Sequence, residues 1–455
     1  MITFDHHPIY KFKRLHLFFF MSIACVIGLS AAVAPASDTS NQKPKTLEDL
    51  DPSMFLMQSI DQESAQEVHP SIFKATGFGN TFLVTTTEGN VIIDTSLPNV
   101  APKHKALLTA VSSEPVRAII VTHGHGDHTG GIHLWRQEGT EVIMHAESVE
   151  FLHYQKRLED FFKIRNASQF GFDLSLVKTD PSKNGNYDAI IPATILVNET
   201  HTLKVGQYTF EIMHTPGETY DAISIFIPEI KALFIGDLFY QSFPNIYTLR
   251  GTKPRWALDY AQSIDKVLAL EPEIMLPSHG EPIYGVEAIF NALTKYRDAV
   301  LYVHDKTVEG MNQGKDVYTL MQEIRLPENL DIGEGYGKIS WSVRGIYEGY
   351  AGWFDGNPAS MYAAPSEIII PELVRLAGGA DKSAELAGEL LEEGCLLKAL
   401  RLTQGILQVE PENRSALKIQ LVCYKRLRQQ AVNFNEAGWL NYGIKQTEKR
   451  LSNTE

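Results

Sequence analysis

The most informative stretch of the sequence is THGHGDHTGG, residues 122–131, which directly follows an apolar run typical of a buried strand. Imidazole and carboxylate side chains are ligands suited to Zn²⁺ and other borderline transition metals. His123 and His125 are two residues apart, so in an extended segment they project to the same side. Asp127 and His128 are adjacent and point in different directions. The stretch therefore predicts two neighbouring metal positions.

Three later positions have the residue type and the context of metal ligands. Glu218, Asp237 and His279 each lie in a predicted loop after an apolar strand, where functional residues concentrate. An isolated acidic residue in such a loop is more often a helix cap or a solvated side chain, so none of the three is specific alone. Together with the first stretch they supply seven candidate ligands, enough for a site that holds two metal ions.

The acidic charge balance argues against a nucleic-acid partner. The formal net charge is -14 and the isoelectric point is about 5.6, whereas binding to a phosphate backbone requires a basic face. Anionic small substrates remain compatible with this charge, because bound cations and a few arginines can set the local field. With 455 residues and 44% hydrophobic residues, the chain can form two or three domains with large cores.

The N-terminus has the pattern of an export signal. Three basic residues precede a mostly apolar stretch over 15–33, which ends in small residues suited to cleavage. An uncleaved anchor helix is the alternative, because the apolar stretch approaches the length that spans a bilayer. We therefore predict a signal peptide over 1–36, a linker or N-terminal arm over 37–67, and an exported protein that is periplasmic or secreted.

Two regions of different pattern follow the arm. Residues 68–300 alternate strand and helix patterns and contain a hairpin signal over 81–94, which predicts a layered α/β fold. Residues 301–455 carry apolar residues at helical spacing. Their rhythm resembles tetratricopeptide units, but too few for a free-standing solenoid. The other predicted elements are helices at 100–111, 256–270, 384–395, 396–409 and 414–427, and strands at 116–121, 141–144, 207–213, 223–227, 232–235 and 274–276.

The ligand pattern resembles that of the metallo-β-lactamase superfamily. The resemblance rests on HxHxDH at 123–128 and on the order of the later candidates, Glu218, Asp237 and His279. Asp94, at the end of a predicted strand, matches a structural aspartate of the same pattern. The resemblance implies an α/β fold: a four-layer αββα sandwich with a metal pair at one edge.

Within the superfamily, the sequence is most similar to the alkyl sulfatase group. That group has glutamate at the position of Glu218, where most members have histidine. Residues 245–251, together with Arg255, resemble a signature of the group. Residues 350–358 resemble the segment that opens its helical dimerisation domain. The resemblance covers about residues 70 to 450, and it implies an all-helical dimerisation domain and a homodimer.

The sequence also departs from the group in three places. Asp237 stands where the group commonly has a longer glutamate. Gln169-Phe170-Gly171 replaces a Tyr-Gly pair near the substrate, so a hydroxyl donor is missing. The sequence ends at Glu455 without the sterol-carrier-like domain that usually follows. The resemblance therefore implies a hydrolase more directly than it implies a long-chain alkyl substrate.

The resemblance also implies a role for each candidate residue. Two Zn²⁺ ions about 3.5–4 Å apart share a water molecule and lower its pKa toward neutrality. Asp127 and Asp237 would act as catalytic carboxylates at these ions. Asn245, Arg250 and Arg255 would bind the anionic head group of the substrate, because guanidinium groups fit planar oxyanions. The implied ligands are His123, His125 and Glu218 for one ion, Asp127, His128 and His279 for the second, and Asp237 as the bridge.

The predicted function is hydrolysis of an anionic ester, with an alkyl sulfate favoured. Another ester or amide, such as a phosphodiester, lactone or β-lactam, is the first alternative, since Arg250 and Asn245 do not separate sulfate from phosphate. Redox chemistry at iron is the second, and His125 argues against it because flavodiiron relatives carry glutamate there. The third is a non-catalytic exported interaction protein, against which the complete ligand set speaks.

Overall fold

The computed structural model describes residues 62–171, 192–362 and 366–453. The predicted signal peptide over 1–36, and the predicted arm as far as residue 61, lie outside these ranges. Within them, no helix combines the length and the apolar character that crossing a membrane requires.

The first sheet has seven strands in sequence order. Its first four strands are antiparallel neighbours, and the hairpin predicted over 81–94 joins the third to the fourth. The last four strands run parallel to one another. The strands are β1 (Gln66–His69), β2 (Ile72–Ala75), β3 (Thr81–Thr86), β4 (Gly89–Ile93), β5 (Val116–Ile120), β6 (Glu141–His145) and β7 (Ile195–Val197).

The second sheet has six strands and is mostly antiparallel. Its parallel pair is β11 with β12, which brings the carboxyl ends of these two strands to the same edge. In spatial order the strands are β13 (Ile283–Tyr284), β12 (Ile274–Pro277), β11 (Ala232–Gly236), β10 (Ile223–Ile227), β9 (Tyr208–His214) and β8 (Thr200–Val205).

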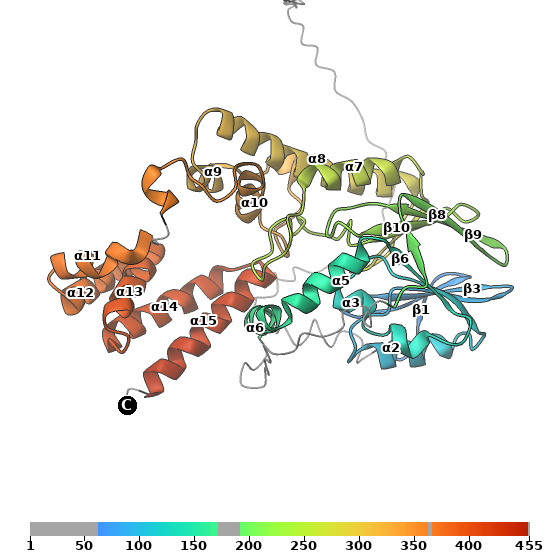
Figure 1. The fold of residues 1–455 in the computed structure, drawn as a ribbon, viewed down its shortest axis with the longest axis horizontal. Coiled ribbons are helices and arrows are strands. Elements are labelled where there is room, and N and C mark those ends of the chain that lie inside the picture. Colours follow the sequence, from blue (N-terminus) through green and yellow to red (C-terminus); the bar gives the residue numbers. More distant parts are fainter. Residues whose placement is uncertain (1–61, 172–191, 363–365, 454–455) are drawn as a thin grey trace, which may run out of the picture. The chain divides into compact units, whose positions relative to one another are not determined.

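The two sheets pack face to face and carry helices on their outer faces (Figure 1). Phe82 of the first sheet meets Phe234 of the second, with ring centroids 5.3 Å apart. Leu108 of α2 (Ala101–Thr109) packs on the outer face of the first sheet, and Tyr260 of α7 (Ala257–Leu268) packs on that of the second. The predicted four-layer αββα sandwich, followed by a helical region, is confirmed.

Helices dominate the chain after the last strand. Their bounds are α8 (Val286–Asn312), α9 (Val317–Glu323), α10 (Ile339–Ala351), α11 (Ile370–Leu376), α12 (Ala380–Glu392), α13 (Leu396–Val409), α14 (Arg414–Gln430) and α15 (Phe434–Asn453). The earlier helices besides α2 and α7 are α3 (Gly126–Thr129), α4 (Ile132–Trp135), α5 (Ser148–Arg157) and α6 (Glu159–Phe170). Helix α8 runs without interruption across the predicted domain boundary at residue 300, and this boundary stays a prediction.

Candidate metal centre

Strand ends of both sheets bring the seven candidate ligands together. The 122–131 stretch begins just after β5 and forms the short helix α3. Glu218 lies in the loop between β9 and β10, and Asp237 directly follows β11. His279 lies two residues after β12, the parallel neighbour of β11. Because these strands end at one edge of the sandwich, residues distant in sequence share one site.

The seven side chains form three overlapping groups, and within each group the ligand atoms lie within 4.8 Å of one another. The groups are His123, His128 and Asp237; Asp127, His128 and His279; and His125, Glu218 and Asp237. The second group is the ligand set implied for one ion, and Asp237 belongs to both other groups, as a bridging residue would. The structure thus brings all seven together, while their role as ligands stays a prediction.

Several close contacts within the cluster centre on two carboxylate oxygens. His279 Nε2 lies 3.1 Å from Asp237 Oδ2 and 3.3 Å from Asp127 Oδ2. His128 Nε2 lies 3.3 Å from Asp127 Oδ2 and 3.6 Å from Asp237 Oδ2. His123 Nε2 lies 2.8 Å from Nδ1 of His125. Imidazole nitrogens and carboxylate oxygens packed this closely form a donor set suited to divalent cations.

Two atoms in this cluster test whether the residues fit a metal pair. His128 Nε2 and Asp237 Oδ1 are buried and accept or donate no hydrogen bond within the described part of the chain. Buried polar atoms are normally paired, and an unpaired one costs about 1–3 kcal/mol. Coordination of a cation would satisfy both atoms. The residues present therefore fit a dinuclear metal site.

Asp94 orients His128 from behind the site. This fully buried residue follows β4 in the left-handed region, with φ 57°. Its Oδ2 accepts from His128 Nδ1 at 2.8 Å and from Ser278 Oγ at 2.7 Å, and Thr122 donates to both carboxylate oxygens at 2.8 Å. Because a carboxylate only accepts hydrogen bonds, Nδ1 carries the proton and Nε2 is left available for a metal ion.

Sequence reasoning missed Asp221, which supports the first two histidines. Its Oδ2 accepts from the backbone N–H of Gly124 at 2.9 Å and from Ser148 Oγ at 2.6 Å. A Cβ added at Gly124 would lie 2.4 Å from the ring of Phe151, so the backbone approaches this ring only as glycine. Asp221 closely follows Glu218 in sequence, but nothing in the pattern indicates its contact with residue 124.

The charges in the cluster shift the pKa values of its members in opposite directions. Burial alone would lower the pKa of His279, but Asp237 and Asp127 raise it to about 10. Burial also acts to lower the pKa of His128, but Asp127 and Asp237 raise it well above its ordinary value. Burial lowers the pKa of His125 well below its ordinary value, and His123 and Arg250 add to this effect. The metal-free protein thus holds protons on the His128 and His279 side of the cluster.

These shifts predict that metal binding releases protons. Because the pKa of His279 is raised to about 10, protonated His279 beside Asp237 and Asp127 stabilises the metal-free protein. This stabilisation is complete below about pH 6.5 and is lost as the pH rises through about 10. A ligating imidazole must be neutral, so Zn²⁺ binding at pH 7 is expected to displace at least one proton. Calorimetric titration in buffers of different ionisation enthalpy measures this release. If His279→Ala released as many protons on Zn²⁺ binding as the native protein, the assignment of His279 as a metal ligand would be contradicted.

Glu218 is enclosed by three partners. Arg255 Nη1 donates to its Oε1, and Tyr240 and Tyr260 donate to its Oε2 at 3.3 and 3.1 Å. Burial raises the pKa of Glu218, while Arg255 opposes this shift. Arg255, with its side chain 1% exposed, also donates to the carbonyl of Asn245 at 2.8 Å. These contacts make Arg255 a residue that positions Glu218, and its predicted contact with the substrate stays a prediction.

Asn245 and Arg250 have polar groups available beside the cluster. Both side-chain polar atoms of Asn245 are buried and lack a hydrogen-bond partner within the described residues. Its backbone N–H donates to Tyr240 at 2.7 Å, which fixes its position. Arg250 Nη2 lies 3.4 Å from His125 Nε2. The structure therefore brings Arg250 to the cluster of candidate metal ligands, as an anion-binding role requires.

An apolar cavity adjoins the cluster at His279. Its volume is about 330 Å³, and its lining combines the loop before β3 with residues of the C-terminal region. Phe78, which packs edge-on against His279 with centroids 5.2 Å apart, forms one wall. The other aromatic lining residues are Tyr240, Tyr336 and Phe434.

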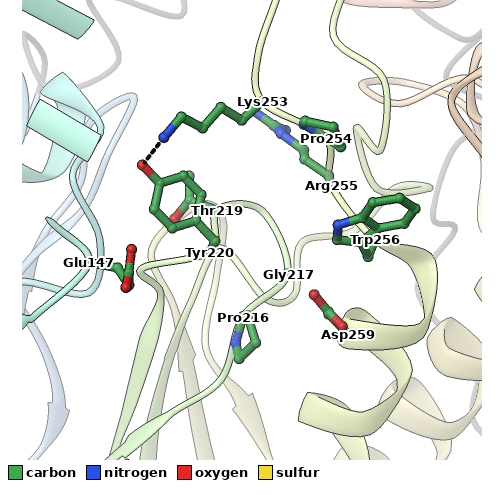
Figure 2. A pocket seen from close by; sticks show the side chains of 10 residues that line it. All are labelled: Glu147, Pro216, Gly217, Thr219, Tyr220, Lys253, Pro254, Arg255, Trp256 and Asp259. Atoms are coloured by element: carbon green, nitrogen blue, oxygen red, sulfur yellow. Dashed lines mark hydrogen bonds between the residues drawn. The ribbon is translucent and has the colours of Figure 1, made fainter. Parts of the chain in front are cut away.

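A second cavity, of about 290 Å³, lies beside the loop that carries Glu218 (Figure 2). Lys253 extends across it and donates to the hydroxyl of Tyr220 at 3.1 Å, as the dashed line shows. Its lining contains charges of both signs, from Lys253 and Arg255 on one hand and Glu147 and Asp259 on the other. This mixed lining suits an apolar ligand less well than the lining of the first cavity does.

Family models match both regions of the chain. Residues 75–279 match the metallo-beta-lactamase superfamily, and residues 317–450 match the alkyl sulfatase dimerisation family. The chain therefore combines a metallo-β-lactamase domain with an alkyl sulfatase dimerisation region, and residues 75–279 form a metal-dependent hydrolase domain.

Individual relatives agree with this assignment. The chain is 29% identical to the linear primary-alkylsulfatase of Pseudomonas sp. over 395 residues, which cover 81% of this chain and 74% of the relative. It is 25% identical to the alkyl/aryl-sulfatase BDS1 of Saccharomyces cerevisiae, over 79% of this chain and 59% of the relative. The solved sec-alkylsulfatase Pisa1 of Pseudomonas sp. shares the fold, with a TM-score of 0.75 and 22% identity over 85% of this chain and 65% of that one.

Proposed function

We propose that this protein hydrolyses alkyl sulfate esters with a zinc pair and a metal-activated water molecule. The observation that carries the proposal is the position of an apolar cavity next to His279, in the same site as the cationic group of Arg250. An alkyl sulfate has this distribution of chemistry, with an anionic head group on an apolar tail. The names of the relatives support the same substrate class.

Each part of the site has a task in this proposal. When bound, the zinc pair supplies Lewis acidity and a water molecule of lowered pKa. Asp94 holds the Nδ1 proton of His128, which leaves Nε2 as the nitrogen that would bind a metal ion, and Arg255 holds Glu218 in place. Arg250 and Asn245 bind the sulfuryl oxygens, because charge-assisted hydrogen bonds to an oxyanion are about twice as strong as neutral ones. Phe78 and Phe434 enclose the tail and exclude water from it.

A substrate screen on the zinc-reconstituted protein tests the proposal. We would compare alkyl sulfates of increasing chain length with the matched alkyl phosphates, a phosphodiester, a lactone and a β-lactam. Burial of each methylene contributes about 0.8 kcal/mol, so kcat/KM is expected to rise by about fourfold per carbon until the cavity is filled. Faster turnover of the phosphodiester, lactone or β-lactam would refute the proposed substrate.

Arg250→Ala tests recognition of the head group. We expect kcat/KM for an alkyl sulfate to fall by about 10²-fold, the loss typical of one preorganised donor to an oxyanion. The rate with a neutral ester of equal chain length should fall by less than about threefold, because its head group carries no charge for the guanidinium to bind. Arg136→Ala removes an exposed arginine outside the site and serves as the control. Equal losses on both esters would contradict the role of Arg250.

We also propose that the C-terminal region forms a homodimer. Apolar side chains of the matched dimerisation region are strongly exposed in the single chain, including Leu376 at 76% and Ile368 at 68%. Exposed apolar residues grouped in one region are typical of protein interfaces. Ile368→Glu combined with Leu376→Glu is expected to give monomers in analytical ultracentrifugation. Val111→Glu, in the catalytic domain, should leave the sedimentation unchanged. An unshifted dimer in the double variant would place the interface elsewhere.

Export is the remaining part of the proposal. It is supported by the basic and apolar pattern of residues 1–36. Cell fractionation followed by N-terminal sequencing of the mature protein tests both the compartment and the cleavage of the signal.

A further inference from the structure

Helix α15, at the C-terminal end of the chain, lies beside helix α6 of the catalytic domain (Figure 1). We propose that Arg165 of α6, held in place by α15, is a positioning residue that sets the location of Arg250 at the metal cluster. The effect on catalysis rests on the proposed function of Arg250. The effect of Arg165 on the position of Arg250 does not rest on that function, and it can be measured separately.

Arg165 donates two hydrogen bonds to the backbone that carries Arg250. Its Nε donates to the carbonyl of Arg250 at 2.6 Å, and its Nη2 donates to the carbonyl of Leu249. The planar guanidinium group presents several donors in a rigid fork, so two successive carbonyls are held in a defined orientation. The backbone turns here, with the N–H of Gly251 donating to Thr248 at 3.0 Å.

Gly251 allows the backbone to turn where it packs on α6. Its φ of +99° lies in the left-handed region, where side chains are strained. A Cβ added there would lie 3.4 Å from the ring of Phe161 and 3.9 Å from Arg165 Nε. The turn therefore packs directly on the helix surface from which Arg165 projects.

The side chain of Arg250 has little else to fix it. Its contact with His125 is long, at 3.4 Å, and its Nε has no hydrogen-bond partner within the described part of the chain. With so few polar contacts, the position of the guanidinium group depends strongly on the position of the Arg250 backbone. The hydrogen bonds from Arg165 to the two carbonyls are therefore the main constraint on where the Arg250 guanidinium lies before a substrate binds.

Helix α15 in turn holds Arg165. The guanidinium carbon of Arg165 lies 5.5 Å from the ring centroid of Trp439, within the range of a cation–π contact. Trp439 Nε1 donates to Gln169 Oε1 at 3.1 Å, and Gln169 Nε2 donates to Asn435 at 2.7 Å. A Cβ added at Gly438 would lie 1.8 Å from the carbonyl oxygen of Gln169, so the helices meet this closely only through glycine.

These contacts place the side chain of Gln169 between α6 and α15, whereas its sequence context suggested a position near the substrate. It belongs to the segment that replaces the Tyr-Gly pair near the substrate of alkyl sulfatases. In this chain its side chain is fully buried and bound to α15 on both of its polar atoms. A polar pair buried in this way specifies how two helices dock. Gln169 therefore acts on the site through the position of Arg250, whereas the neighbouring Phe170 packs against Phe78 and Phe434 of the apolar cavity.

The test compares two variants of α6 that lose one positive charge each. Arg165→Met should lower kcat/KM for an alkyl sulfate by about tenfold, mainly through KM, and the rate with a neutral ester by less than twofold. It should also raise the inhibition constant for inorganic sulfate by about tenfold. Lys163→Met removes a lysine that pairs with Glu159 on the same helix, and should change none of these values. Arg165→Lys keeps one donor and should restore part of the loss.

Hydrogen exchange of the peptide covering residues 245–255 gives a readout independent of turnover. We expect faster exchange in Arg165→Met and in Trp439→Ala than in the native protein, and no change in Lys163→Met. If the native protein hydrolysed no sulfate ester, the proposed function would fail, while the exchange data would still decide the positioning role. Exchange unchanged in Arg165→Met, or equal rate losses on both esters, would overturn the inference.

Discussion

Asp237→Asn is expected to reduce the zinc content from two ions per chain to one or fewer and to lower kcat/KM by about 10³-fold. Asp237 belongs to two of the three groups of ligand atoms, and its Oδ2 lies 3.1 Å from His279 and 3.6 Å from His128. The amide removes the negative charge that two neighbouring cations would share. A loss of several kcal/mol in transition-state stabilisation corresponds to a rate loss of this size.

Metal analysis and steady-state kinetics on the purified variant measure the two effects. Asp259→Asn, a carboxylate of α7 outside the three groups, serves as the control and should retain both ions and most of the activity. The assignment of Asp237 as the bridge would be wrong if the variant kept two ions and the native rate. A variant with two ions and no activity would instead separate a catalytic role from metal binding.

Asp94→Asn is expected to weaken zinc binding by about 10–100-fold, the usual effect of losing a residue that orients a metal ligand. Three donors converge on Asp94 Oδ2, namely His128 Nδ1, Thr122 Oγ1 and Ser278 Oγ. An amide nitrogen at this position donates instead of accepting. His128 would then carry its proton on Nε2, the atom that faces the metal cluster, and could not ligate.

The same change should also destabilise the folded protein by about 2–4 kcal/mol, because buried donors lose their acceptor. Competition with a chelator measures the metal affinity, and urea denaturation of the metal-free protein measures the stability. Ser278→Ala removes one of the three donors and leaves the carboxylate, so it should change the zinc affinity by less than about threefold. If Asp94→Asn bound zinc like the native protein, the tautomer argument would be refuted.

Much of the fold could be predicted from the sequence because its signals are local. The hairpin over 81–94 and the strands around 116–121 and 223–235 have alternating or continuous apolar patterns bounded by turn residues, and the structure has strands there. Helix α13 matches its predicted range of 396–409. The N-terminal strands β1 and β2 were not predicted, because their sequences, QEVH and IFKA, are neither alternating nor continuously apolar.

The residue types at the site were also visible in the sequence, whereas the residues that support them were not. The 122–131 stretch is dense enough in metal-binding side chains to be noticed alone. Asp221 and Arg165 look like ordinary polar residues, because their partners are backbone groups of distant segments. The partner of Gln169 in α15 is 266 residues away in sequence. Contacts of this kind leave no periodic pattern.

The chemistry available to this protein could be read from its residues alone: a compact run of three histidines and one aspartate, three later ligand candidates and two arginines. Which partner each side chain meets depends on the folded structure. It placed Arg255 on Glu218, and it brought α15 against α6 behind Arg250. The physical reason is that ligand type is a property of a single residue, whereas tautomer, charge state and position are set by neighbours that only folding brings together.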